Sequence, residues 1–197
     1  MVARQSYPKF LFIQPENENI GVEYLSASLK KNHIPVDLLF LPHPFNNIAV
    51  HFIPSQHKSD IQKIYKKIEI SKPDIICFSP FTSQYLWVSE QACLIKKKYP
   101  QLTILCGGVH VNSVPAEVIK NKYIDAIIVG EADLQIVEFA KYFYSPKLLR
   151  LPSVWIKRQG KLYQNQLLPL VKNIDSFPFA DKDIFYSQIP RPLRDTA

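Results

Sequence analysis

Three of the five glycines in this 197-residue chain directly follow two short apolar runs. Gly107 and Gly108 come after "LTILC", and Gly130 comes after "AIIV". A residue without a Cβ atom lets the backbone pass close to a bound group or adopt a positive φ. The glycines therefore indicate either a ligand-binding edge or a pair of tight turns, and the sequence leaves both interpretations open.

Hydroxyl and aromatic side chains follow another apolar run, "DIICF". Ser79, Thr82 and Ser83 offer hydroxyl groups that hydrogen-bond phosphates or amides, and Phe81 offers a flat apolar face. Ser79 and Thr82 also have a purely structural alternative, because both residue types cap helices and a helix is expected to follow. This segment is therefore either a binding loop or a helix start.

An imidazole and a carboxylate stand beside the glycines. We interpret His110, which follows a predicted strand, as part of a binding edge rather than of the core. Glu131, which follows Gly130, has two interpretations. It contacts a ligand, or it complements the dipole of the next helix, and its position in the chain favours the second.

Alternating apolar runs and helical segments supply the scaffold for these residues. Runs that are apolar at nearly every position suit strands covered on both faces of a parallel sheet. Five such runs occur, namely "KFLFIQP", "PVDLLFLP", "DIICFSPF", "LTILCGG" and "AIIVGEA". Amphipathic spacing predicts helices at residues 20–32, around 61–68, and at 88–99, 115–121 and 132–144.

Repeated strand–helix units predict an α/β fold with a doubly wound, five-stranded parallel sheet in the flavodoxin-like, Rossmann-like order 2-1-3-4-5. Ligands of such sheets bind beyond the carboxyl ends of the strands, where the glycines, hydroxyls, imidazole and carboxylate all lie. Beyond residue 145, two alternating runs around Gln159 and Gly160 predict a β-hairpin, followed by a Pro- and Asp-rich extended tail. We divide the chain into a domain at residues 1–145 and a hairpin with connector at residues 146–197.

Composition narrows the class of protein. The chain is 47% hydrophobic, with no apolar run near the roughly 20 residues of a membrane span and no signal-peptide pattern. We therefore expect a soluble cytoplasmic protein without a membrane partner. The net charge is +7, but the lysines fall mainly on predicted helix faces, so we expect no nucleic-acid partner. Cys77, Cys93 and Cys106 are too widely spaced for a disulfide framework or a CxxC metal site and are expected to be core thiols.

The pattern as a whole resembles a known family. The run "CGGVHVNSVPAEVIKNKYIDAIIVGEAD" is similar to the GG-x-H, P-E, D and G-E positions of the N-terminal cobalamin-binding domain of B12-dependent radical SAM enzymes. "NIGVEYLSASLKKNHIPVDLLFL" and "KPDIICFSPFTSQY" resemble its first helix, second and third strands and third loop. "LPSVWIKRQGKLYQNQ" and "NIDSFPFADKDIF" resemble the hairpin and connector that lead into its barrel. The resemblance covers nearly the whole chain.

The resemblance implies a cobalamin-binding module of a methyltransferase-type radical SAM system that is not catalytic alone. It implies that Gly107, Gly108 and His110 pass along the nucleotide tail of cobalamin, and that "SPFT" lines the region beneath the corrin ring. The expected cofactor-binding set is Ser79, Phe81, Thr82, Ser83, Gly107, Gly108, His110, Gly130 and Glu131. No catalytic residue and no protein ligand to a metal are expected.

Three departures from the family pattern refine these expectations. The D-x-H-x-x-G motif is absent, since none of the five histidines has Asp two residues before it, so we expect cobalamin with its base off and no histidine on the cobalt. "GEAD" stands where the family usually shows G-E-G-E. C-x-x-x-C-x-x-C is also absent, so we expect no iron–sulfur cluster in this chain.

Two hypotheses follow for the role of the chain. In the first, the cobalamin module acts with a radical SAM barrel, either in the same polypeptide or as a separate partner. In the alternative, the chain is a flavodoxin-like regulatory or interaction domain that no longer binds cobalamin. A receiver domain is disfavoured because "IQPENEN" and "FSPF" stand where its acidic pair and its phosphorylated Asp would be.

Overall fold

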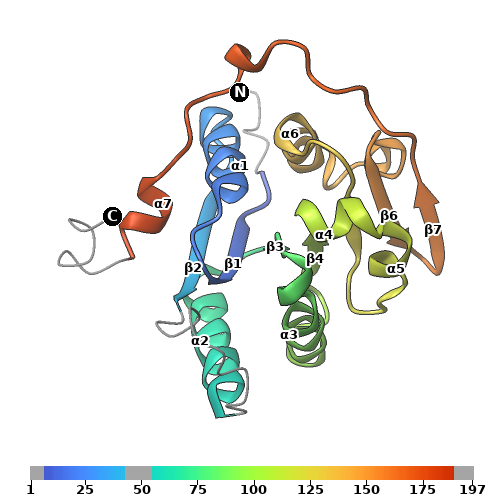
Figure 1. The fold of residues 1–197 in the computed structure, drawn as a ribbon. Helices are drawn as coiled ribbons and strands as arrows, with labels where there is room; N and C mark the ends of the chain where they lie inside the picture. The colour runs from blue at the N-terminus through green and yellow to red at the C-terminus, as the bar shows by residue number, and fades with distance from the viewer. Residues whose placement is uncertain (1–6, 43–54, 189–197) are drawn as a thin grey trace, which may run out of the picture.

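A seven-stranded sheet forms the centre of the computed structural model, which describes residues 7–42 and 55–188. The strands lie in the order β2-β1-β3-β4-β5-β6-β7 (Figure 1). Their bounds are β1 Phe10–Glu16, β2 Val36–Pro42, β3 Ile75–Phe78, β4 Thr103–Cys106, β5 Ala126–Ile128, β6 Val154–Arg158 and β7 Lys161–Gln164. Strands β1 to β5 are parallel, which confirms the predicted order 2-1-3-4-5.

Helices cover both faces of the parallel strands because these strands are apolar on both faces. Phe10 and Phe12 of β1 pack in the core beneath α1 (Ile20–Lys31) and α6 (Asp133–Tyr142). Leu11 of the same strand points into the opposite core, which lies beneath the second helical layer. That layer consists of α2 (Ser55–Ser71), α3 (Tyr85–Lys98) and α5 (Pro115–Lys120). The predicted helices are therefore confirmed, with ends that differ by a residue or two, except that α2 begins earlier and ends three residues later than predicted and α3 begins three residues earlier.

Two short helices were not predicted. Helix α4 (Gly108–Ser113) begins directly after β4, where a loop was expected, and it buries Val111. Helix α7 (Asp183–Tyr186) interrupts the tail that was expected to be extended, because Phe185 is fully buried. Short 3₁₀ turns also occur at Thr82–Gln84, Pro146–Arg150 and Ile174–Ser176.

The predicted hairpin is part of the sheet rather than an appendage to it. β6 pairs antiparallel with β5, placing Val154 opposite Ile128 and Ile156 opposite Ala126, and β7 pairs with β6. Val154 and Ile156 are buried, so the alternating pattern that predicts the hairpin also supplies an inner face. The predicted strand number of five is therefore extended to seven. The division of the chain at residue 145 stays a prediction.

The connector, residues 165–188, returns across the molecule from β7 to β2 (Figure 1). Its end is held on α1 by Asp181, whose carboxylate lies 2.6 Å from Lys30 Nζ and whose backbone N–H donates to the carbonyl of Glu23. Burial, together with the hydrogen bond and charge of Glu18, raises the pKa of Glu23 to about 7. Carboxyl groups thus gather where the connector meets α1.

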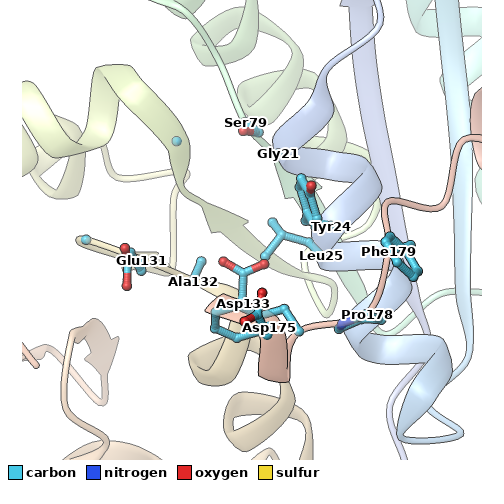
Figure 2. Close-up of a pocket in the computed structure, with 13 residues that line it drawn as sticks. Gly21, Tyr24, Leu25, Ser79, Glu131, Ala132, Asp133, Asp175, Pro178 and Phe179 are labelled. Atoms are coloured by element: carbon cyan, nitrogen blue, oxygen red, sulfur yellow. The ribbon is translucent and has the colours of Figure 1, made fainter. Parts of the chain in front are cut away.

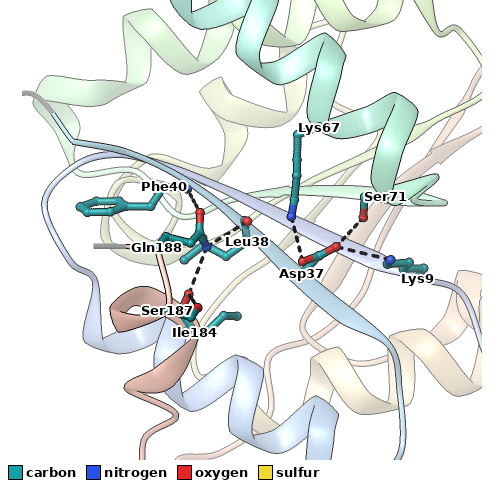
Figure 3. Close-up of polar contacts among 9 residues, drawn as sticks. All are labelled: Lys9, Asp37, Leu38, Phe40, Lys67, Ser71, Ile184, Ser187 and Gln188. Carbon is teal, nitrogen blue, oxygen red and sulfur yellow. Dashed lines mark hydrogen bonds and ion pairs between the residues drawn. The ribbon is translucent and has the colours of Figure 1, made fainter. Parts of the chain in front are cut away.

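Polar contacts on both sides fix the edge strand β2 (Figure 3). On one side, the side-chain amide of Gln188 accepts a hydrogen bond from Phe40 N and donates one to Leu38 O, which completes the hydrogen bonding of β2 at these residues. On the other side Asp37 accepts from Lys67 and Ser71. Burial opposes ionisation of Asp37, but these hydrogen bonds outweigh it and lower its pKa.

Candidate cofactor-binding site

A cavity of about 710 Å³, here called the main cavity, opens beyond the carboxyl ends of β3, β4 and β5. In Figure 2, side chains of α1 stand on one side, residues that follow β5 stand on the other, and the connector completes the wall. The lining residues are Gly21, Tyr24, Leu25, Ser79, Gly108, Gly130, Glu131, Ala132, Asp133, Asp175, Phe177, Pro178 and Phe179. The cavity therefore lies at the edge of the sheet where the sequence predicts a ligand.

A narrow passage of about 30 Å³ adjoins the main cavity and lies between the sheet and helices α1 and α6. Leu25, Ser79, Gly108 and Ala132 line both spaces. The remaining walls of the passage come from Phe12, Cys77, Phe78, Leu105, Cys106, Gly107, Ile128 and Ile136. The passage is thus apolar and leads inward from a polar rim.

The three glycines beside these spaces differ in backbone conformation and in the room that a side chain would have. Gly108 has φ +84°, and a Cβ there would stand 2.6 Å from Ser79 Oγ, so the turn itself requires glycine. Gly130 has φ +88° and no heavy atom within 4 Å of a Cβ position. Gly107 is extended, and its added Cβ would meet only Ile128 O, at 3.8 Å. The backbone conformation at position 107 therefore does not require glycine, and the missing side chain leaves open space beside the passage.

The loops after β1 and β3 are tied together at the rim. Asn19 caps α1 by accepting from the N–H groups of Gly21 and Val22, and its amide donates to Ser79 O at 3.0 Å. Gln84 is buried and donates to Glu16 Oε2 at 3.1 Å. These bonds fix the backbone on which Ser79 enters the cavity. Ser79 does not have the helix-capping role that was its structural alternative, because the 3₁₀ turn and α3 that follow begin at the caps Phe81 and Gln84.

The structure places His110 away from both spaces. Its Nδ1 lies 3.2 Å from Thr82 Oγ1, and its ring packs on Tyr85 with centroids 4.2 Å apart. Burial lowers the pKa of His110, which favours the neutral imidazole. Phe81 and Ser83 are exposed on the same loop. These three residues and Thr82 thus form a neighbouring group that lines neither the cavity nor the passage, and their predicted contact with cobalamin stays a prediction.

Glu131 holds the connector against the rim of the cavity. Its carboxylate accepts from Val171 N at 2.9 Å, and α6 begins only two residues later, at Asp133. Burial raises the pKa of Asp133, and the charge of Glu131 raises it further. Glu131 is therefore a lining residue and an anchor rather than a first-turn residue of the helix.

Two buried thiols line the passage. Burial raises the pKa of Cys106 to about 12 and that of Cys77 well above its ordinary value, so both remain protonated. Cys93 is only partly buried. The expectation of core thiols is therefore confirmed for Cys77 and Cys106 and met only in part by Cys93. Within residues 7–42 and 55–188, no three His, Cys, Asp or Glu residues are placed to hold a metal ion.

Sequence reasoning missed the α1 and connector walls of the cavity. Gly21, Tyr24 and Leu25 follow the capping Asn19, and their helical spacing was the available signal. The connector residues Asp175 to Phe179 carried no such signal, because their position depends on a return across the whole sheet.

In the described part of the chain no helix is long and apolar enough to cross a membrane. The cytoplasmic location stays a prediction.

Two curated proteins are similar to this chain in sequence. The chain is 28% identical over 167 residues to an uncharacterized methyltransferase of Pyrococcus horikoshii, PH0819, covering 84% of this chain and 33% of that protein. It is 27% identical over 92 residues to the cobalamin-dependent radical SAM methyltransferase TokK of Streptomyces tokunonensis, covering 45% of this chain and 14% of that protein. The chain therefore spans a third or less of the length of these relatives.

A solved structure shares the fold. The radical S-adenosylmethionine methyltransferase TsrM of Kitasatospora setae superposes with a TM-score of 0.64 at 9% sequence identity, covering 80% of this chain and 30% of that one. The family model described as the B12 binding domain matches residues 13–140, which run from within β1 to the end of β5 and beyond and include every predicted site residue. The chain thus belongs to the B12-binding domain family.

Proposed function

We propose that this chain binds cobalamin in the base-off form, with the nucleotide tail in the passage beside Gly107 and Gly108 and the corrin ring over the main cavity. The observation that carries the proposal is that the two spaces adjoin and share the lining residues Leu25, Ser79, Gly108 and Ala132. A tail that enters such a passage cannot also hold its base on the cobalt.

The residues present fit the chemistry of this cofactor. The main cavity, about 710 Å³, has the volume of a typical ligand site, and its rim offers acceptors for the amide groups of the corrin ring. The passage is apolar, as an aromatic base requires. Its 30 Å³ is about the volume of one water molecule, so α1 and α6 must move apart for a base to enter. We therefore expect slow binding.

The lower face of the cobalt is proposed to lack a histidine ligand. No histidine among the described residues lines the main cavity or the passage, and His110 is engaged with Thr82 and Tyr85. His43 lies outside the described residues. The side chains of the first loop, from Gln14 to Asn19, offer amides and carboxylates, which are poor ligands for this metal compared with imidazole.

The chain is proposed to serve as the cofactor-binding part of a methyltransferase-type radical SAM system. The named relatives, one described as cobalamin-dependent and radical SAM, support this reading. Bound cobalamin would supply methyl-carrying or redox chemistry at its cobalt. The residues of this chain would hold and orient it, exclude water from the passage, and leave the other face of the ring for a barrel in the same polypeptide or in a partner.

Binding and the state of the base can be tested together. The protein is incubated with hydroxocobalamin and desalted, and the absorption spectrum should show retained cofactor with the base off. Electron paramagnetic resonance of the Co(II) form should show no triplet splitting, because a lower nitrogen ligand would split each cobalt line into three. No retention would favour the regulatory-domain alternative. Retention with triplet splitting that vanishes in His43→Ala or His110→Ala would make that histidine the ligand, and splitting that survives in both variants would mean that the benzimidazole stays on the metal.

A further inference from the structure

A side groove of about 140 Å³ lies between the first turn of α6 and connector residues 167–171. It shares Gly130, Glu131, Asp133 and Phe177 with the main cavity, so the two spaces adjoin. Leucines, a proline and a valine of the connector form its apolar wall. A ligand seated over the main cavity therefore has a lateral space into which one peripheral group can extend.

A glutamine with an unsatisfied side chain lines this groove. Gln135 of α6 is 5% exposed, and its Oε1 has no hydrogen-bond partner. Buried polar atoms of folded proteins are nearly always hydrogen-bonded, so an unpaired one beside a cavity suggests a partner that enters from outside. The hydroxyl of Ser153 also lines the groove, and because it accepts from Leu168 N its own proton is left to donate.

The charged residues around the groove indicate which kind of chemical group that partner carries. Glu131 and Asp133 are the charged residues among its described lining, and both are carboxyls. An anionic group would be repelled, whereas a neutral group with N–H donors would be attracted. A primary carboxamide has two such donors and one acceptor. It can pair with the amide of Gln135 in both directions.

We propose that Gln135 binds a carboxamide side chain of the corrin rim, and that the groove thereby fixes the rotation of the ring over the main cavity. The inference rests on the proposed function, since it requires that cobalamin occupies the cavity. Gln135 is a binding residue for the periphery of the cofactor, remote from the cobalt.

A second glutamine provides a matched control. Gln91 of α3 is 1% exposed and also has an unpaired Oε1, but it lines neither the cavity, the passage nor the groove. Gln91→Met and Gln135→Met each replace a buried amide whose oxygen is unpaired by an apolar side chain of similar length. Both should raise the Tm of the ligand-free protein by about 2–4 °C, because an unsatisfied buried group is removed. Only Gln135→Met should affect cobalamin.

The experiment measures the dissociation constants of hydroxocobalamin and of its monocarboxylic acids, in each of which one peripheral amide is a carboxylate. For the wild-type protein, one acid should bind about tenfold more weakly than the others, because it no longer offers N–H donors to Gln135 and its carboxylate faces Glu131 and Asp133. Gln135→Met should weaken hydroxocobalamin about tenfold and reduce the penalty of that acid. Gln91→Met should bind every ligand as the wild-type protein does.

Several outcomes would overturn the inference. Unchanged hydroxocobalamin binding by Gln135→Met would do so, as would a loss of affinity that leaves the penalty of each acid unaltered. If Gln135→Met fails to fold, the acid series on the wild-type protein decides, because equal affinities for all the acids would exclude an amide subsite in the groove. Failure of the wild-type protein to bind hydroxocobalamin at all would instead refute the proposed function on which the inference rests.

Discussion

Gly107→Ala should make the free protein more stable and the cofactor bind more weakly. The backbone at Gly107 is extended, with φ −145°, so alanine adopts it without strain. Replacing glycine at a compatible position stabilises a protein by about 0.4–1 kcal/mol through the unfolded state. Burying one more methyl group in the passage adds about 0.8 kcal/mol. The sum of roughly 1–2 kcal/mol corresponds to a rise in Tm of about 2–8 °C.

The same methyl group occupies space that the nucleotide base needs. The passage measures about 30 Å³, and the added Cβ would stand 3.8 Å from Ile128 O, in ordinary contact with its wall. Forcing an extra methyl into a filled site typically costs about 1–3 kcal/mol. The dissociation constant for hydroxocobalamin should therefore rise about 5- to 150-fold. Thermal unfolding and a spectroscopic titration measure the two effects on the same sample.

Gly108→Ala separates this effect from general damage at the turn. Alanine at Gly108 must adopt φ +84° and displace Ser79 Oγ, so this variant should lose stability. Gly107→Ala should raise the Tm and Gly108→Ala should lower it, which would show that the backbone conformation requires glycine only at position 108. If Gly107→Ala gains stability yet binds hydroxocobalamin as tightly as the wild-type protein, the tail does not lie in the passage, and the placement of the cofactor is wrong.

Three further predictions test other parts of the molecule. Gly130→Ala and Gly160→Ala should lower the Tm by similar amounts, because both glycines have positive φ and open space at Cβ, but titration should show weaker cobalamin binding only for Gly130→Ala. The raised pKa of Glu23 means that its stabilising contribution is complete below about pH 4.5 and is lost as the pH rises through about 7, so Glu23→Gln should flatten the fall in Tm between pH 5 and 8. Gln188→Leu should speed hydrogen exchange at the Phe40 amide about tenfold, and an unchanged rate would show that the contact is not maintained in solution.

Local patterns were sufficient for the parallel core. The runs that become β3 and β5 are apolar at every position and are wholly buried, so their strand character and their place inside a sheet could be predicted without tertiary information. The pairing of β6 with β5 could not. The alternation of Val154 and Ile156 specifies an inner face but does not specify which edge that face will join.

The candidate site, like the fold, could be predicted from the sequence only in part. Gly107, Gly108, Gly130 and Ser79 follow strand ends, and the position of a strand end in a parallel sheet fixes their meeting point. His110 follows a strand end as well, but the helix that begins at Gly108 turns its ring toward Thr82 and Tyr85, and its predicted contact with cobalamin stays a prediction. The connector wall depends on contacts between residues far apart in the chain, which no local pattern encodes.

The hydrogen bond from Gln188 to Leu38 joins residues that are 150 positions apart, and this separation has a consequence for biosynthesis. Strand β2 emerges from the ribosome early, yet the N–H of Phe40 and the carbonyl of Leu38 find their partner only after α7 has been made. An edge strand with free backbone groups invites association with other chains. Late closure of distant contacts also slows folding. A shortened version that stops before residue 181 would therefore be prone to aggregation during expression, even though every strand of the sheet is present.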